Sequence, residues 1–321
     1  RKLRQEGMAI LFITHFINQA YEITARITVL RNGELVGQFQ TEELPRIELI
    51  AKMLGRDVTE FEGENEGEDS GEPGGEKEVF YQVRGMESNG AISAFDLDIR
   101  KGDVLGLAGL LGSGRTAIAR LLFAIDRPQK GITRLNGSEV VITSPRKAIV
   151  YFFGLCPEDR KTEGIISDLT VRENIILAIQ ARDGIFKTIP RKKQEEIVDK
   201  YIKALDIKTP GSEQIMNNLS GGNQQKVIIA RWLASNPEFL ILDEPTRGVD
   251  VGAKAEIEKL IASLSREEGM AILFISSELE EVIRCSDRVA VLRDRKKLTE
   301  LTGEQIEDST IMHIIASEDV G

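Results

Sequence analysis

In the larger, C-terminal part of the chain, hydrophobic residues follow the spacings of strands and helices in turn. Apolar and polar residues alternate in Val79–Val83 and Ile92–Ile99 as they do in half-buried strands. Asp103–Gly109, Phe239–Pro245 and Met270–Ser276 are short apolar runs, which are typical of buried strands. Because such strands alternate with helices, the pattern predicts an α/β fold with a largely parallel sheet.

Helical spacing occurs in three other segments. Arg115–Ile125 and Ala253–Glu267 are each predicted to be a helix, and Leu169–Ile207 has a helical pattern throughout. Arg134–Ile142 contains Asn-Gly, which signals the tight turn of a β-hairpin. We therefore expect a hairpin and a mainly helical segment beside the parallel strands.

A seven-residue phrase occurs twice in the chain. Gly7–Ile13 is identical to Gly269–Ile275 at an offset of 262 residues, and the first copy continues to His15 where the second has Ser277. A repeat of so long a period indicates two copies of a whole domain rather than a solenoid. Only about 55 residues precede the acidic stretch that follows the first copy, and the chain begins with arginine. We therefore expect residues 1–57 to be the C-terminal tail of a first, truncated domain in a piece of a longer protein. In such a tail, the strand expected at Met8–Thr14 would lack its neighbours and present unpaired edges.

The charge of the chain is unevenly distributed. The net charge is −10 at pH 7, and Thr59–Glu78 alone holds nine acidic residues, one lysine and five glycines. A segment with so much charge and so little to bury is expected to be a flexible linker, at 58–78, before a second domain at 79–321. An acidic chain argues against a nucleic-acid partner. No apolar run approaches the length of a bilayer span, and Cys156 and Cys285 form no disulfide framework.

Gly109–Thr116, GLLGSGRT, lies between a predicted strand and a predicted helix. It fits the phosphate-loop pattern G-x-x-x-x-G-K-[ST] except that Arg115 replaces the lysine. Glycines allow successive backbone amides to surround phosphate oxygens, and the following helix adds the positive end of its dipole. Thr116 would supply a hydroxyl to Mg²⁺.

Two more segments carry chemistry of the same kind. Leu219–Val227, LSGGNQQKV, places a serine and two glycines at the start of a helix, where backbone amides point towards an anion. Phe239–Asp250, FLILDEPTRGVD, ends a buried strand in two carboxylates. Asp243 would hold Mg²⁺, and Glu244 would orient or deprotonate an attacking water.

These three segments, in this order and spacing, closely resemble the ATP-binding cassette family. The resemblance covers Val79 to about Ser317, and Arg1 to about Asp57 as the tail of a preceding cassette. It implies a P-loop NTPase fold with a parallel core sheet, an antiparallel β subdomain and a helical subdomain, with ATP and Mg²⁺ as cofactors. Pro157–Ile165, PEDRKTEGI, adds a finer match. With it, the chain looks like the second cassette of tandem ATPases from bacterial sugar importers of the ribose/galactose/xylose type.

The resemblance implies roles for individual residues. His15 matches the switch histidine of the first cassette, Ser277 stands at that place in the second, and Glu158 falls where most cassettes have glutamine. The catalytic residues implied are Glu244, Glu158 and His15, and the Mg²⁺ ligands are Thr116, Asp243 and Glu158. The nucleotide-binding residues are Gly109, Leu110, Leu111, Gly112, Ser113, Gly114, Arg115, Thr116 and Ala117, and the signature residues are Leu219, Ser220, Gly221, Gly222, Asn223 and Gln224.

In the family, two cassettes pair head to tail, and each ATP lies between the phosphate loop of one and the signature of the other. The signature here would serve the first cassette's ATP together with His15, whereas the second ATP would meet Arg115 and Ser277. Serine cannot replace an imidazole as a proton relay. Because the chain holds one phosphate loop without the signature that would cap it, we expect feeble or no ATP hydrolysis by this chain alone.

The resemblance also implies partners and a location. The ATPase would sit peripherally on the cytoplasmic face of the inner membrane, bound to a pair of membrane permease subunits. An extracytoplasmic sugar-binding protein would be an indirect partner, and nucleic acid none. The main expectation is thus an ATPase that powers sugar import.

Two other functions stay open from the sequence. A soluble tandem cassette that acts on the ribosome usually has a longer and often basic helical linker, unlike the short acidic segment here. A non-hydrolysing regulatory cassette is compatible with Arg115 and Ser277 in the second site.

Overall fold

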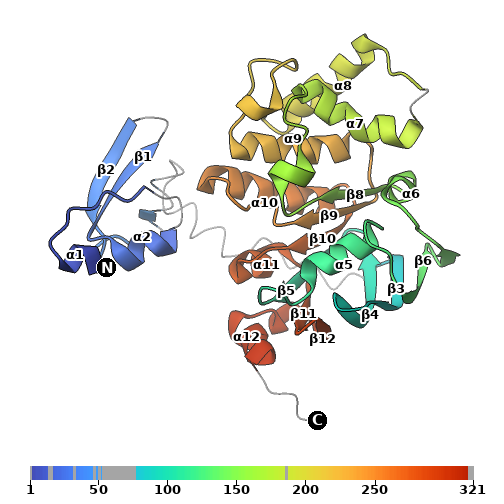
Figure 1. Cartoon of the computed structure of the whole chain (residues 1–321), viewed down its shortest axis with the longest axis horizontal. Helices are drawn as coiled ribbons and strands as arrows, with labels where there is room; N and C mark the ends of the chain where they lie inside the picture. The colour runs from blue at the N-terminus through green and yellow to red at the C-terminus, as the bar shows by residue number, and fades with distance from the viewer. Residues whose placement is uncertain are drawn as a thin grey trace. The chain divides into compact units, whose positions relative to one another are not determined.

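The computed structural model describes residues 2–13, 17–31, 34–45, 48–49, 52, 77–184 and 187–316. The chain forms two compact units, the smaller of Arg1–Gly75 with Asp250–Ala255 and the larger of Glu76–Val249 with Glu256–Gly321 (Figure 1). Most of the expected linker at 58–78 lies outside the described residues, and so does His15. The domain boundaries expected from the sequence therefore stay predictions.

The smaller unit contains a β-hairpin. Its elements are α1 (Lys2–Gln5), α2 (Ile17–Ile23), β1 (Arg26–Arg31) and β2 (Glu34–Gln40), and the two strands pair antiparallel. Val29, Leu44 and Leu49 form a small buried core. The hydroxyl of Tyr21 donates a hydrogen bond to the carbonyl of Leu44 at 2.6 Å, which ties α2 to the segment after the hairpin.

Residues 8–13 correct one expectation from the sequence. Because their repeat was predicted to be a strand, we expected a strand here as well, with unpaired edges. The structure gives residues 8–13 no strand, and Leu11 and Ile13 are 89% and 88% exposed. A strand is stabilised by the chains that pair with its amides and carbonyls, and no described strand pairs with this segment.

A six-stranded sheet forms the centre of the larger unit (Figure 1). In spatial order the strands are β12 (Lys296–Thr302), β11 (Arg288–Arg293), β5 (Val104–Gly109), β10 (Ala271–Ile275), β9 (Phe239–Asp243) and β8 (Phe153–Cys156). Five of them run parallel, and β12 is antiparallel at one edge. Every residue of β9 and β10 is buried, as is usual for strands inside a parallel sheet. The parallel sheet predicted from the apolar runs is confirmed.

A second sheet of the larger unit is antiparallel. Its strands in spatial order are β4 (Ile92–Arg100), β3 (Val79–Ser88), β6 (Lys130–Leu135) and β7 (Ser138–Val140). The predicted hairpin is therefore confirmed. Asn136 and Gly137 form its turn with φ of 48° and 78°, the left-handed conformations that an Asn-Gly pair favours.

Helices make up the rest of the larger unit. They are α5 (Arg115–Leu122), α6 (Pro145–Val150), α7 (Val171–Asp183), α8 (Arg191–Ala204), α9 (Gly221–Leu233), α10 (Val251–Arg266, of which Glu256–Arg266 belong to this unit), α11 (Leu279–Cys285) and α12 (Asp308–Ala316), with short turns η1 (Arg160–Gly164), η2 (Met216–Asn218) and η3 (Gly303–Gln305). The predicted helical stretch at 169–207 is two helices, because Gly184 ends α7 and Pro190 precedes α8. Among the described helices, none is long and apolar enough to cross a bilayer.

Three of these helices form a separate layer. Figure 1 shows α7, α8 and α9 together at one end of the larger unit, and α7 packs against both of the others. In contrast, α5 packs against β5, β9 and β10 of the central sheet. The structure thus has the parallel core, the antiparallel β part and the helical part that the resemblance implied.

Arg231 of α9 joins this helical layer to the turn η1. Its guanidinium donates hydrogen bonds to the carbonyl and Oδ1 of Asn174, both at 2.8 Å, and to the carbonyl of Gly164 at 2.6 Å. Burial lowers the pKa of Arg231 to about 10, so the group stays charged at neutral pH and its hydrogen bonds are charge-assisted. The network fixes the end of η1, and with it the loop that carries Glu158.

Candidate functional site

The loops that follow β5, β9 and β10 meet at one edge of the central sheet. Parallel strands present their carboxyl ends at the same edge, and ligands of α/β folds bind there. In the strand register, Ile275 of β10 pairs with Asp243 of β9 and with Leu107 of β5. The structure therefore brings the end of β5, the carboxylate of Asp243 and the start of the loop after β10 to one place.

Gly109–Thr116 forms the turn from β5 into α5. Gly114 has a φ of 102°, a left-handed conformation that glycine adopts without strain, and α5 begins after it without a side-chain cap. The hydroxyl of Ser113 is buried and has no hydrogen-bond partner. An uncapped helix start and an unpaired buried hydroxyl fit a ligand rich in acceptor oxygens, such as a phosphate chain.

The other residues of this turn differ in exposure. Leu110 and Leu111 lie at its tip and are 61% and 95% exposed, whereas Ala117 lies in the first turn of α5. The apolar side chains therefore point away from the protein interior, and the backbone of the turn is what a phosphate would contact.

Arg115 reaches across the site. Its guanidinium donates a hydrogen bond to the carbonyl of Ser276 and lies 3.9 Å from Oε1 of Glu244. The hydroxyl of Ser277 donates to Oε2 of Glu244 at 3.0 Å. Glu244 has a φ of 52°, which costs a non-glycine residue on the order of 1–2 kcal/mol, and its amide bonds to the carbonyl of Ile275 at 2.9 Å. The loops after β9 and β10 are therefore tied together at Glu244.

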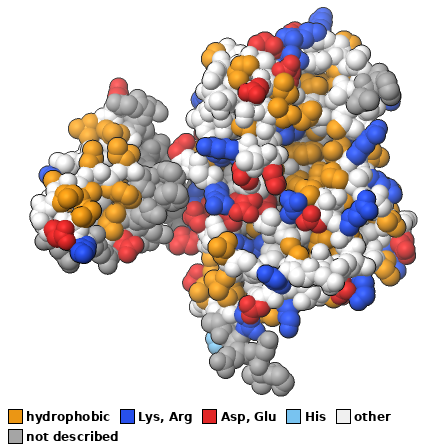
Figure 2. Space-filling model, viewed as in Figure 1, with side chains coloured by type: hydrophobic (Ala, Val, Ile, Leu, Met, Phe, Trp, Pro, Cys, Tyr) orange, Lys and Arg blue, Asp and Glu red, His pale blue; other side chains and the backbone are white. Residues whose placement is uncertain are grey.

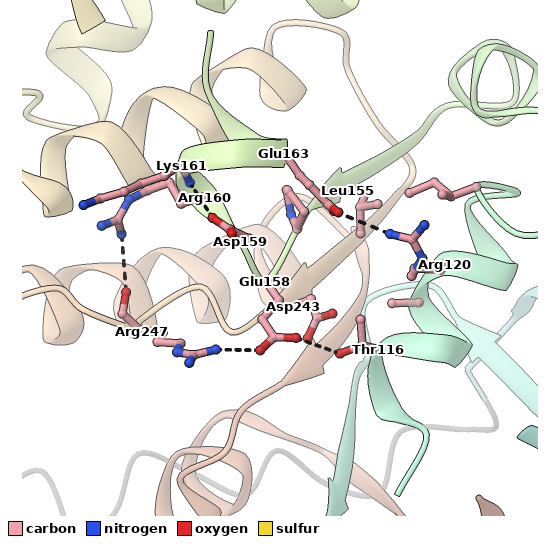
Figure 3. Close-up of a pocket in the computed structure, with 13 residues that line it drawn as sticks. Thr116, Arg120, Leu155, Glu158, Asp159, Arg160, Lys161, Glu163, Asp243 and Arg247 are labelled. Atoms are coloured by element: carbon pink, nitrogen blue, oxygen red, sulfur yellow. Dashed lines mark hydrogen bonds and ion pairs between the residues drawn. The ribbon is translucent and has the colours of Figure 1, made fainter. Parts of the chain in front are cut away.

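Asp243, Thr116 and Glu158 lie close together among the residues that line a cavity (Figure 3). Asp243 is 2% exposed, and its Oδ1 has no hydrogen-bond partner. Burial raises the pKa of Asp243 to about 7, with a smaller contribution from the carboxylates of Glu158 and Glu244, while Thr116 and Arg115 act in the opposite direction. The hydroxyl of Thr116 donates to Glu158 at 3.3 Å.

These three side chains fit a magnesium ion. Mg²⁺ is bound in proteins by carboxylate and hydroxyl oxygens together with phosphates. An unpaired, buried oxygen of Asp243 beside the oxygens of Thr116 and Glu158 offers such ligands. A bound cation would also favour the ionised form of Asp243, which its burial disfavours.

A cavity of about 470 Å³ opens beside these carboxylates. Its lining residues are Thr116, Ala119, Arg120, Ile125, Leu155, Pro157, Glu158, Asp159, Arg160, Lys161, Glu163, Asp243 and Arg247. Glu158 forms an ion pair with Arg247 at 2.5 Å, and Arg120 lies 3.5 Å from Glu163 (Figure 3). With its many charged groups, the cavity suits a polar ligand or a polar segment of a partner.

The predicted signature, Leu219–Gln224, lies at the start of α9. Ser220 is exposed and precedes the helix without capping it, and its hydroxyl accepts a hydrogen bond from Asn223 at 2.8 Å. Gln224 is buried and donates to the carbonyl of Met216 at 3.2 Å. Among the described residues, no hydrogen bond or ion pair joins this segment to Gly109–Ala117. The structure therefore leaves this uncapped helix start separate from the phosphate loop of its own unit.

Space around Gly221 of the signature is limited. A Cβ atom on this residue would lie 2.9 Å from Nη2 of Arg160 and 3.1 Å from the carbonyl oxygen of Gly248. A larger residue here would have to displace the guanidinium and would crowd the backbone of the loop after β9.

Sequence reasoning missed two residues that shape the site. Arg247 lies inside the quoted segment DEPTRGVD, but its partner Glu158 is 89 residues away, and no local pattern links them. Glu281 is fully buried and accepts hydrogen bonds from Thr246 and Ser276 at 2.7 and 2.6 Å. It belongs to an acidic run, ELEE, which normally faces solvent, so only the fold identifies it.

Several known proteins are similar in sequence to this chain. Residues 92–247 match a family model described as ABC transporter. The fructose import ATP-binding protein FruK of Bifidobacterium longum (strain NCC 2705) is 48% identical over 321 residues, which are 100% of this chain and 62% of that protein. The galactofuranose transporter ATP-binding protein YtfR of Escherichia coli (strain K12) is 48% identical over 99% of this chain and 62% of its own length. The ribose import ATP-binding protein RbsA of Yersinia pestis is 40% identical over 97% and 60%.

The chain thus spans 60–62% of the length of these relatives. Solved structures of ATP-binding cassettes share its fold. The cassette MJ1267 in its ADP conformation has a TM-score of 0.63 at 22% identity, covering 75% of this chain and 100% of that one. The dimeric post-hydrolysis state of the cassette MJ0796 bound to ADP and Pi has a TM-score of 0.61 at 21% identity, covering 69% and 98%.

The raised pKa of Asp243 predicts how stability depends on pH without divalent cations. An unfolded aspartate has a pKa of about 3.9, whereas that of Asp243 in the folded chain is about 7. Between these values the folded state holds a proton that the unfolded state has lost, so this group makes the free energy of unfolding fall as pH rises. The free energy of unfolding of Asp243→Asn, taken relative to that of the wild type, should therefore rise by about 3 kcal/mol between pH 5 and pH 8.

Urea denaturation of both proteins at pH 5 and pH 8, with a chelator present, measures this difference. A difference between variant and wild type that is the same at both pH values would contradict the raised pKa.

Proposed function

We propose that the chain carries an ABC transporter ATPase domain, and that it binds and hydrolyses ATP with Mg²⁺ to power sugar import through membrane permease subunits. The observation that carries the proposal is the meeting of Arg115, Asp243 and Glu244 beside the uncapped start of α5. The unpaired buried oxygens of Ser113 and Asp243 support a metal-bound phosphate as the ligand. The relatives are ATP-binding proteins of fructose import, galactofuranose transport and ribose import, which supports a sugar as the cargo.

In this proposal, the residues that bind the nucleotide and Mg²⁺ differ from the residue that activates the water. The first amides of α5 and the guanidinium of Arg115 bind the phosphates. Thr116, Asp243 and Glu158 would hold Mg²⁺, which offsets the negative charge of the phosphates. Glu244 accepts a hydrogen bond from the attacking water and takes up its proton.

The signature at the start of α9 is proposed to serve a nucleotide on another cassette. Its uncapped helix start and the exposed Ser220 support this, as does its separation from the phosphate loop. His15 would complete the site that α9 caps, whereas Ser277 belongs to the site with Arg115. Since this chain offers no second signature to its own phosphate loop, we expect it to hydrolyse ATP feebly when alone.

The membrane subunits are proposed to dock on the loop Glu158–Gly164 and on the helical segment 169–207. Figure 2 shows hydrophobic side chains gathered on the face of the larger unit where α6, α7 and β8 lie in Figure 1. Val150, Phe152, Ile166 and Leu177 are 50%, 40%, 42% and 37% exposed. Apolar side chains exposed together are typical of protein interfaces. Docking there would keep the chain at the cytoplasmic face of the inner membrane, below a permease supplied by an extracytoplasmic sugar-binding protein.

A non-hydrolysing regulatory cassette is a second candidate. It is favoured by one observation, which is that both carboxylate oxygens of Glu244 are engaged by Arg115 and Ser277. A cassette of this kind would bind ATP and close without cleaving it.

Arg115→Ala tests nucleotide binding. Removing the cation of the phosphate loop should weaken the affinity of the chain for Mg·ATP by roughly 10- to 100-fold, since charge-assisted contacts to phosphate are lost. Titration calorimetry measures the affinity, with Arg266→Ala, an exposed arginine at the end of α10, as the matched control. Equal affinities of Arg115→Ala and the wild type would remove the support for a phosphate loop.

Crosslinking tests the docking surface. In the whole transporter, a photoreactive group at Leu177 or Ile166 should crosslink to the permease, because both side chains are partly exposed on the proposed surface. The matched control is the same group at Ile132 of β6, which is 48% exposed on the antiparallel sheet. Crosslinks from the control position alone would place the permease elsewhere.

The two sites should differ in the whole tandem protein with its membrane partners. Loss of a group that stabilises the transition state costs roughly 10²–10³-fold in rate, so His15→Ala should abolish most ATPase activity. Ser277→Ala should change it by only a few-fold. Steady-state turnover at saturating ATP measures both, and equal losses would mean that the sites are equivalent. Any turnover that survives in His15→Ala belongs to the site described here, and its complete absence favours the regulatory candidate.

A further inference from the structure

Both carboxylate oxygens of Glu244 are engaged. Oε1 faces Nη2 of Arg115 at 3.9 Å, and Oε2 accepts the hydrogen bond of Ser277 at 3.0 Å. The side chains of Arg115 and Glu244 are 9% and 8% exposed, so water screens their attraction little. Both oxygens are therefore engaged by protein groups, and a water that approaches Glu244 has to compete with these groups for a hydrogen bond.

The position of Arg115 is itself fixed by the loops around it. Its guanidinium also donates a hydrogen bond to the carbonyl of Ser276, directly after β10. Glu281 binds the hydroxyls of Ser276 and Thr246, so it fixes the loops after β10 and after β9 relative to each other. A guanidinium has two donor edges and can serve both loops, which the single ammonium group of a lysine does not match.

Arg115 also stands where a phosphate would bind. It is the first residue of α5 and the single basic residue in Gly109–Ala117. Arginine binds phosphate through charge-assisted and often bidentate hydrogen bonds. A phosphate on this turn and the carboxylate of Glu244 therefore compete for one guanidinium.

We infer that Arg115 is exchanged between these two anions. Without nucleotide it is bound to Glu244, and when nucleotide binds, the phosphates take it over and leave Glu244 held by Ser277 alone. Arg115 and Ser277 are thus positioning residues for Glu244, and occupancy of the phosphate loop frees the base. The inference rests on the proposed nucleotide binding and adds a contact that regulates that same site.

A double-mutant cycle in ADP affinity tests the exchange. ADP is used because it lacks the γ-phosphate that an ATPase removes, so a block in hydrolysis by Glu244→Gln does not affect the measured affinity. Glu244→Gln keeps the shape of the side chain and removes the competing charge, and it should tighten ADP binding about tenfold. In the Arg115→Ala background the same substitution should change the affinity by less than about twofold.

Asp126→Asn is the matched control for this cycle. It neutralises a carboxylate that pairs with another arginine of α5, Arg120, at 2.8 Å, and it should leave ADP affinity unchanged. Tightening by Glu244→Gln that is equal with and without Arg115 would overturn the exchange. If the wild type binds no ADP at all, the proposed nucleotide binding fails, and the exchange fails with it. ADP binding without coupling overturns the exchange alone.

Thermal melting of the nucleotide-free chain is the second measurement. Arg115→Ala leaves Glu244 buried without its cation and should lower the melting temperature by roughly 4–8 °C. Adding Glu244→Gln should restore at least half of this loss, because the buried charge is then removed as well. If the double variant melts no higher than Arg115→Ala, the pair does not hold Glu244, and the inference is wrong.

Discussion

The pairing of β10 with β5 on one side and with β9 on the other is the constraint on which the site depends. Backbone hydrogen bonds fix the register, so that Ile275 lies beside Asp243 and Leu107. A slip of one residue would move the side chains of a strand to the opposite face of the sheet. Since all three strands are buried almost throughout, such a slip would expose or clash with core side chains. The rigid sheet thus places a glycine turn and two carboxylates at one edge.

Several groups at this edge of the sheet are in energetically unfavourable states when no ligand is bound. Burial raises the pKa of Asp243 to about 7, Ser113 and Asp243 each keep a buried oxygen without a partner, and Glu244 has a left-handed backbone. Each of these features costs free energy in the chain alone. Proteins keep such costs mainly where a ligand relieves them. A metal-bound phosphate would pair the unsatisfied oxygens, and this agrees with the proposed nucleotide site.

Local patterns were sufficient to predict most elements of the larger unit. The apolar runs that became β5, β9 and β10 and the Asn-Gly turn each depend on neighbouring residues, and the phosphate-loop segment was found from its glycines. The pairs that organise the site could not be found in this way. Glu158 meets Arg247 at a separation of 89 residues, and Arg115 meets Ser276 at a separation of 161. Such contacts depend on how the sheet and its loops are assembled.

The repeated phrase GMAILFI separates what the sequence determined from what the tertiary structure decided. By itself it determined that both copies are strongly apolar and suited to a buried strand. In the larger unit, residues 271–275 form β10 and are entirely buried between two parallel strands. In the smaller unit, residues 8–13 form no strand, and several of their apolar side chains are exposed. The difference arises because the amides and carbonyls of a strand are satisfied by neighbouring strands, and its side chains by the helices that cover the sheet. Identical residues therefore fold differently where those neighbours differ.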